Sequence, residues 1–142
     1  MRTLFLLPAS LLASLLYSAS AGAQTLPYPR TDTDAMSTVS VKAPPKTVRV
    51  RPDQAEIIGG SYAMSNGWRL KVRTPSRYID ATIDREEPMR LYAVAPYKFA
   101  STDGNVNMEF NRGPVGEDML MSYVPDQRLG QVVVISSTLA QR

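Results

Sequence analysis

From Gly59 onward the chain is a series of short runs rich in valine, isoleucine, tyrosine and phenylalanine, separated by glycines. Seven of its eight glycines lie in this part. β-Branched and aromatic residues favour strands, and glycine favours the tight turns between them. The pattern therefore predicts an all-β domain, a small antiparallel meander that forms a barrel or a sandwich of about eight short strands. We expect these strands at roughly residues 60–64, 68–73, 78–83, 89–94, 97–101, 105–110, 118–124 and 131–138.

The expected strands are short, because none reaches far beyond seven residues. Strands that cross an outer membrane need about nine to eleven residues, so these lengths favour a soluble β fold. Helix has one signal, at Pro52–Glu56, where a proline suited to a first turn is followed by Asp53 and Glu56. This segment predicts a single helical turn.

The first 23 residues have the pattern of a cleavable secretory signal. Arg2 precedes a leucine-rich apolar run from Leu4 to Leu16, and the small residues Ala21-Gly22-Ala23 suit a cleavage site. The run is too short to span a bilayer, and no later stretch approaches about eighteen consecutive apolar residues. We therefore expect a signal peptide at 1–23, a periplasmic or secreted mature chain, and no transmembrane anchor.

Residues 24–56 differ in composition from the residues that follow. They contain five prolines and no glycine, which predicts a proline-rich extended tail before a β domain at 57–142. Two alternating pieces of this tail, Val39–Lys42 and Val48–Arg51, have the pattern of strands that could join a sheet edge, and this question stays open. Because the chain has no cysteine, its stability must come from a packed core.

The register of the hairpin around Asn66-Gly67 can be chosen by asking which turn buries all the apolar side chains on one face. A two-residue turn would divide the apolar side chains between both faces of the sheet, and a buried face does not tolerate this. A three-residue loop, Ser65-Asn66-Gly67, instead places Met64 opposite Trp68 and Tyr62 opposite Leu70. We expect this loop, with the side chains of Arg69, Lys71 and Arg73 together on the outer face.

The same test applied to Asp103-Gly104 favours a two-residue turn. That turn pairs Ser101 with Val106 and Phe99 with Met108, which keeps the apolar side chains on one face. The connection from Asp84 to Pro88 leaves its register open, because both faces of Arg77–Ile83 carry apolar groups.

Several turn glycines and core positions resemble those of the small β-rich accessory domain found beside serine-β-lactamase-like hydrolases and in short exported bacterial proteins. These positions are Gly60-Ser61-Tyr62, Asn66-Gly67, Leu70, Val72, Leu91-Tyr92-Ala93, Phe99, Asp103-Gly104 and Val106 through Phe110. The resemblance covers about residues 58–124 and implies a closed or nearly closed β fold with no established chemistry of its own. The Ser-x-x-Lys motif of the hydrolases is absent from the chain.

The residues that usually carry catalysis are scarce. The chain has no histidine and no cysteine, which removes the usual general base at neutral pH, the thiolate nucleophile and nearly every zinc site. The densest acidic group is Asp80, Asp84, Glu86 and Glu87, which we interpret as solvated loop residues rather than a hydrolase carboxylate pair. The group also lacks the alternating ligands of a calcium loop. We expect no enzymatic activity, no cofactor and no bound metal.

The best candidate for binding is the outer row Arg69, Lys71 and Arg73, joined by Arg77 after the Thr74-Pro75 turn. We name these four residues the cationic row. Such a row attracts anionic partners, and the alternative is a solvated face whose charges discourage edge pairing. Tyr62 and Trp68 are further binding candidates if they line a barrel mouth, although a lone tryptophan on a strand is more often part of the core.

After loss of Arg2 with the signal, 15 basic residues face 13 acidic ones, a balance that argues against nucleic-acid binding. The leading expectation is an exported, non-enzymatic β domain for binding or structural support at the cell envelope, with an anionic envelope component or an exported protein as its partner. The alternative is a proteinaceous inhibitor of an exported hydrolase such as lysozyme.

Overall fold

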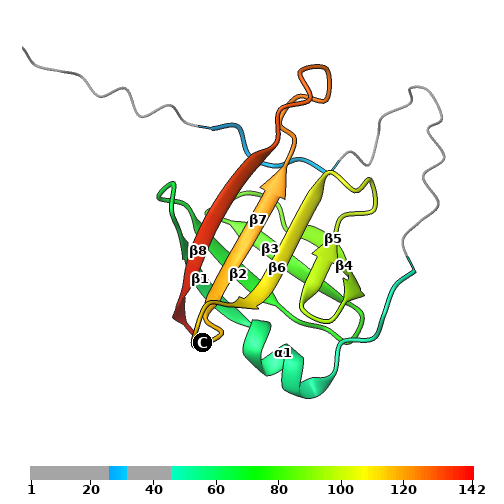
Figure 1. Cartoon of the computed structure of the whole chain (residues 1–142), viewed down its shortest axis with the longest axis vertical. Helices are drawn as coiled ribbons and strands as arrows, with labels where there is room; N and C mark the ends of the chain where they lie inside the picture. The colour runs from blue at the N-terminus through cyan, green and yellow to red at the C-terminus, as the bar shows by residue number, and fades with distance from the viewer. Residues whose placement is uncertain (1–25, 32–45) are drawn as a thin grey trace, which may run out of the picture.

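The computed structural model describes residues 26–31 and 46–142, and shows a closed eight-stranded β-barrel with one short helix (Figure 1). The expected all-β class is confirmed, and the barrel is the form that it takes. Each strand pairs antiparallel with the next, and β1 pairs with β8 to close the sheet. In chain order the elements are α1 (Pro52–Ile58), β1 (Gly60–Met64), β2 (Arg69–Arg73), β3 (Tyr78–Ile83), β4 (Met89–Ala95), β5 (Lys98–Ala100), β6 (Val106–Arg112), β7 (Asp118–Tyr123) and β8 (Val133–Gln141).

The strands form because their apolar residues alternate with polar ones. In β2, Leu70 and Val72 are buried while the three residues around them are exposed. An eight-stranded barrel has an interior just wide enough for side chains to fill. Here the interior is filled by the inward residues of all the strands, the largest of them Tyr123, Phe99, Phe110, Leu70, Ile79, Ile83, Leu91, Met108, Met119 and Met121.

The hairpin between β1 and β2 has the expected three-residue loop. Tyr62 pairs with Leu70, and the Met64 N–H donates to the Trp68 carbonyl at 2.9 Å. Gly67 has φ +90°, a conformation that side chains other than glycine rarely adopt. Arg69, Lys71 and Arg73 are exposed on the outer face, as predicted.

The hairpin between β5 and β6 confirms the expected register but not the expected turn. Phe99 pairs with Met108, and the Ser101 N–H donates to the Val106 carbonyl. The loop is wider than two residues, because the Gly104 N–H donates to the Ser101 carbonyl at 2.9 Å. Asp103 accepts the Asn105 N–H, and this local hydrogen bond favours the wider loop over the expected two-residue turn.

Segments before β1 cover both ends of the barrel (Figure 1). At one end lies α1, which extends to Ile58 and is therefore longer than the single turn expected at Pro52–Glu56. The Tyr62 hydroxyl donates to the Ile58 carbonyl at 2.8 Å and joins this helix to β1. At the other end, residues 26–31 cross the barrel, where the Tyr123 hydroxyl donates to the Pro27 carbonyl and Asn105 donates to the Arg30 carbonyl.

Residues 46–51 form a further segment that packs on the barrel, which we name the strap. It is not a regular strand, but the Val48 N–H donates to the Ala93 carbonyl at 2.8 Å and the Val50 N–H donates to the Ser76 carbonyl at 3.1 Å. Val50 is buried in the core. The Val48–Arg51 piece therefore bonds to Ala93 in β4 and to Ser76 just before β3, whereas Val39–Lys42 lies outside the described residues.

Candidate functional site

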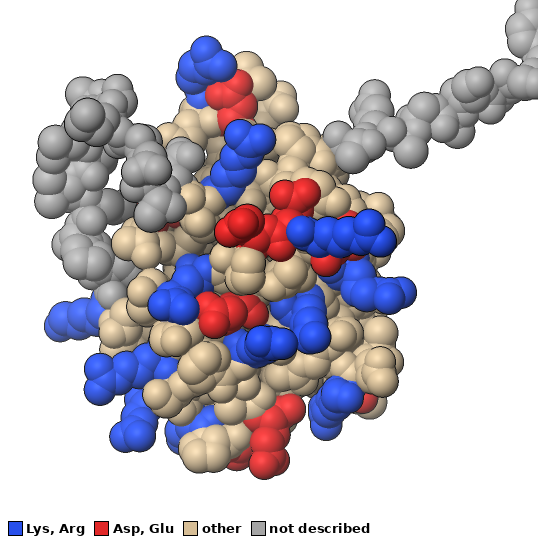
Figure 2. All heavy atoms as spheres, turned by 180° about the vertical axis from the view of Figure 1, so that it is seen from behind, with Lys and Arg blue, Asp and Glu red and all other residues tan. Residues whose placement is uncertain are grey.

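The cationic row lies on the outer face of β2 and just before β3. All four of its side chains are exposed. Seen from behind, the barrel carries many lysine and arginine side chains on this face, interrupted by acidic groups (Figure 2). Arg69, Lys71 and Arg73 lie on β2, which is hydrogen-bonded to both β1 and β3 in the closed sheet, so they do not lie at a sheet edge.

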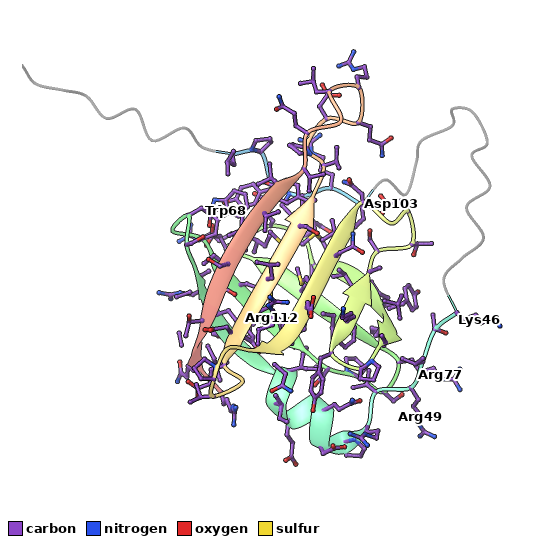
Figure 3. All side chains as sticks on the ribbon, in the orientation of Figure 1. Lys46, Arg49, Trp68, Arg77, Asp103 and Arg112 are labelled. Carbon is purple, nitrogen blue, oxygen red and sulfur yellow. The ribbon has the colours of Figure 1, made fainter. Side chains whose placement is uncertain are left out.

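The cations of the row have no ion pair in the part of the chain that the structure describes. The same is true of Lys46 and Arg49 in the strap, which project with Arg77 from one side of the barrel (Figure 3). Other basic residues are paired with carboxylates, namely Arg51 with Asp53, Arg90 with Asp80, Lys98 and Arg112 with Glu109, and Arg128 with Asp126. Within the described residues, the charges of the cationic row, Lys46 and Arg49 are therefore not held in ion pairs, unlike that of Arg51.

The acidic residues near the row have partners elsewhere. Asp80 pairs across the sheet with Arg73, but its carboxylate accepts the Arg90 Nε–H at 3.1 Å, and this bond raises the pKa of Arg90. Asp84 accepts the backbone N–H of Arg69 at 2.8 Å and the Tyr28 hydroxyl at 2.9 Å. Among the described residues, no cluster of three or more carboxylates could hold a metal ion.

Tyr62 and Trp68 lie inside the barrel rather than on a binding surface. Tyr62 is buried, and burial raises the pKa of its hydroxyl to about 12. Trp68 is only 8% exposed and stacks against Tyr28. Both side chains already contact protein groups, so neither faces an open barrel mouth.

An aromatic pair beside the row was missed by sequence reasoning. Tyr78 and Tyr92 pair across β3 and β4 with ring centroids 6.2 Å apart, and the Arg90 guanidinium lies 4.0 Å above the Tyr78 ring. Both rings are half-buried on the outer face, because Ile79 and Leu91 take the inward positions. The sequence could have indicated this pair only if it had fixed which residues of β3 and β4 face inward. That register was the one that the sequence left open.

A hollow at the strap was also missed. It has a volume of about 310 Å³ and lies between the strap, the start of α1 and the turn from β4 to β5. Sequence reasoning could not place it, because its walls come from residues 48–54 and 93–99, which are far apart in the chain.

No helix in the described ranges is both long and apolar enough to cross a membrane. Comparison of the chain with family models, with curated proteins and with solved structures finds no match in any of the three. The resemblance of residues 58–124 to the accessory domain beside serine-β-lactamase-like hydrolases therefore stays a prediction.

Proposed function

We propose that this chain is an exported, non-enzymatic β-barrel that binds an anionic component of the cell envelope through the cationic row. The observation that carries the proposal is the position of the row. Charged rows on exposed edge strands are explained by protection from edge pairing, but β2 is paired on both sides. Protection of an edge therefore does not account for the three exposed cations of β2.

The surroundings of the row support an anionic partner. Arg69, Lys71 and Arg73 project from alternate positions of one short strand, so their charges add to a local positive potential. Tyr78 and Tyr92 add half-buried rings beside this charge. Tyrosine and arginine are the residue types that most often dominate binding energy at interfaces.

The composition and the core support a binding role without catalysis. The chain has no histidine or cysteine to act as base or nucleophile. The barrel interior is occupied by large apolar side chains, so the outer surface is the part available to a partner.

The test measures binding to vesicles that contain phosphatidylglycerol and to an acidic cell-wall polymer at several salt concentrations. We expect binding that weakens steeply as salt rises, because exposed charges are screened beyond roughly 8 Å at physiological ionic strength. Replacing Arg69 and Lys71 together by glutamine should abolish it.

A matched control replaces Lys98 and Arg112 by glutamine. These residues are also one lysine and one arginine, but both pair with Glu109 on β6, which lies four strands from β2 in the closed eight-stranded barrel. The control should bind like the unmodified chain. Equal loss in the two double variants would show a net-charge effect and would refute a specific row, as would failure of the unmodified chain to bind either probe.

A second candidate, inhibition of an exported hydrolase such as lysozyme, is supported by the loop between β7 and β8, which projects beyond the barrel (Figure 1). Leu129 and Val132 in this loop are 67% and 62% exposed. Asp126 fixes the loop by accepting the Arg128 N–H at 2.9 Å. An assay of lysozyme with the chain present would show inhibition that Leu129→Asp relieves and the row variant does not.

A further inference from the structure

The hollow at the strap has mainly apolar walls. The strap forms one wall, and the end of β4 with the turn to β5 forms the other. Pockets for small ligands begin at about 300 Å³ and combine apolar walls with a few polar groups. The apolar residues that line this hollow are Val48, Val50, Ala93, Ala95, Pro96, Tyr97 and Phe99.

One polar side chain in the wall has an unused donor. Gln54 is only 6% exposed, and its Oε1 accepts the Arg51 backbone N–H at 3.1 Å. Its amide NH₂ group donates to no residue in the described ranges. Among the described residues no side-chain nitrogen or oxygen is both buried and unpartnered, so this NH₂ group reaches the open space of the hollow. A polar donor on an otherwise apolar wall suits an acceptor on a ligand.

The charges around the hollow favour an anionic acceptor. The charged residues of its lining are Arg49 and Arg51, so the charge of the lining is positive. Arg51 is held by Asp53 at 3.0 Å, whereas Arg49 is exposed and has no ion pair within the described part of the chain. An anion with one apolar end would therefore be favoured over a neutral or cationic molecule of the same shape.

We propose that this hollow binds a small amphiphile that has a carboxylate head and a short apolar chain. The carboxylate accepts a hydrogen bond from the Gln54 amide and is attracted by Arg49. The apolar chain packs between Val48 and Phe99. The site does not include the cationic row, so this inference goes beyond the proposed function and does not depend on it.

Tyr97 provides a variant that separates binding from folding. Pro96 and Tyr97 form the turn from β4 to β5, and Tyr97 has φ +61°, which is strained for any residue with a side chain. Its side chain lines the hollow. Glycine at this position relieves the strain, but it removes part of the wall and the packing of the ring against the core.

The experiment titrates the purified chain with octanoate near neutral pH and follows binding by calorimetry and by NMR shifts of the lining residues. Octanol and octylammonium have the same chain with a neutral and a cationic head. We expect octanoate to bind at least about tenfold more tightly than either. A hydrogen bond to a charged group contributes enough binding free energy for a tenfold difference in affinity. Equal affinity for octanol, or no binding of octanoate, would overturn the proposal.

Two variants locate the site. Gln54→Glu keeps an oxygen for the Arg51 N–H but replaces the donor by a carboxylate, so it should lose octanoate and gain affinity for octylammonium. Tyr97→Gly should unfold at a temperature close to that of the unmodified chain, because relief of backbone strain offsets the lost ring packing, and yet bind octanoate less tightly. Octanoate binding that neither variant changes would place the ligand elsewhere and refute the assignment. The double variant of Arg69 and Lys71 should bind octanoate normally, which keeps this result separate from that for the row.

Discussion

Tyr28 stacks on Trp68, with ring centroids 4.6 Å apart and an angle of 20° between the ring planes. The Tyr28 hydroxyl also donates to Asp84 at 2.9 Å. A residue well ahead of β1 thus covers the single tryptophan of the chain at one end of the barrel. The contact makes residues 26–31 part of the folded unit, although composition alone places them in an extended tail.

Replacing Tyr28 by alanine should expose Trp68 to water. We expect its fluorescence emission to move to longer wavelength, its quenching by iodide to increase and the unfolding temperature to fall, because the stacked ring is lost. Tyr28→Phe keeps the ring and loses only the hydroxyl, so its emission should stay close to that of the unmodified chain. Unchanged emission in Tyr28→Ala would contradict the stacked arrangement.

The Tyr62 hydroxyl should make stability depend on alkaline pH. Burial raises its pKa from 10.0 to about 12, so the unfolded chain loses this proton at lower pH than the folded chain does. The contribution is complete below about pH 10 and is lost as the pH rises to about 12, because unfolding is then coupled to proton release. Urea denaturation at several alkaline pH values measures it.

Tyr62→Phe serves as the reference in that experiment, because the other tyrosines and the lysines titrate equally in both chains. At neutral pH it should cost about 1 kcal/mol, since the bond to the Ile58 carbonyl is lost. Above pH 10 the stability of the unmodified chain should fall more steeply than that of the variant. Parallel curves would show that the hydroxyl is not buried.

Closure of the barrel should be sensitive to Gly60. This residue has φ +148°, and a Cβ there would lie 2.6 Å from the Gln141 carbonyl oxygen on β8. We expect Gly60→Ala to lower the free energy of unfolding by about 2 kcal/mol or more, from backbone strain together with the clash. Gly67→Ala is the control, because it is also strained but meets nothing within 4 Å. Its loss should be smaller, and equal losses would contradict the close approach of β1 to β8.

The strands were predictable because each depends on local alternation. The loop Ser65-Asn66-Gly67 could be chosen because only one register buries both Tyr62 and Trp68. The length of the loop at Asp103 was predicted wrongly, because it depends on a hydrogen bond from the Asn105 N–H to the Asp103 side chain. The alternation of apolar and polar residues gives no information about such a bond. The exposure of the cationic row follows from the same alternation as the strands.

The hollow and the Tyr28 contact could not be predicted in this way. Gln54 meets the end of β4 only because the strap bonds to Ala93 and Ser76, and a linear pattern does not show which distant segments will meet. Tyr78 and Tyr92 were hidden for a related reason. Both faces of Arg77–Ile83 carry apolar groups, so alternation alone could not say which residues turn outward.

The covering of both barrel ends by residues that precede β1 fixes an order of events during folding. Because a chain is synthesised from its N-terminus, Pro27 and Arg30 are made before any strand that they contact. Their partners Tyr123 and Asn105 follow 96 and 75 residues later. Contacts between such distant residues form slowly, because a long loop must close first. Residues 26–31 can therefore complete these contacts only after β7 has been made, so the earliest part of the described chain waits for most of the sheet before it reaches its place.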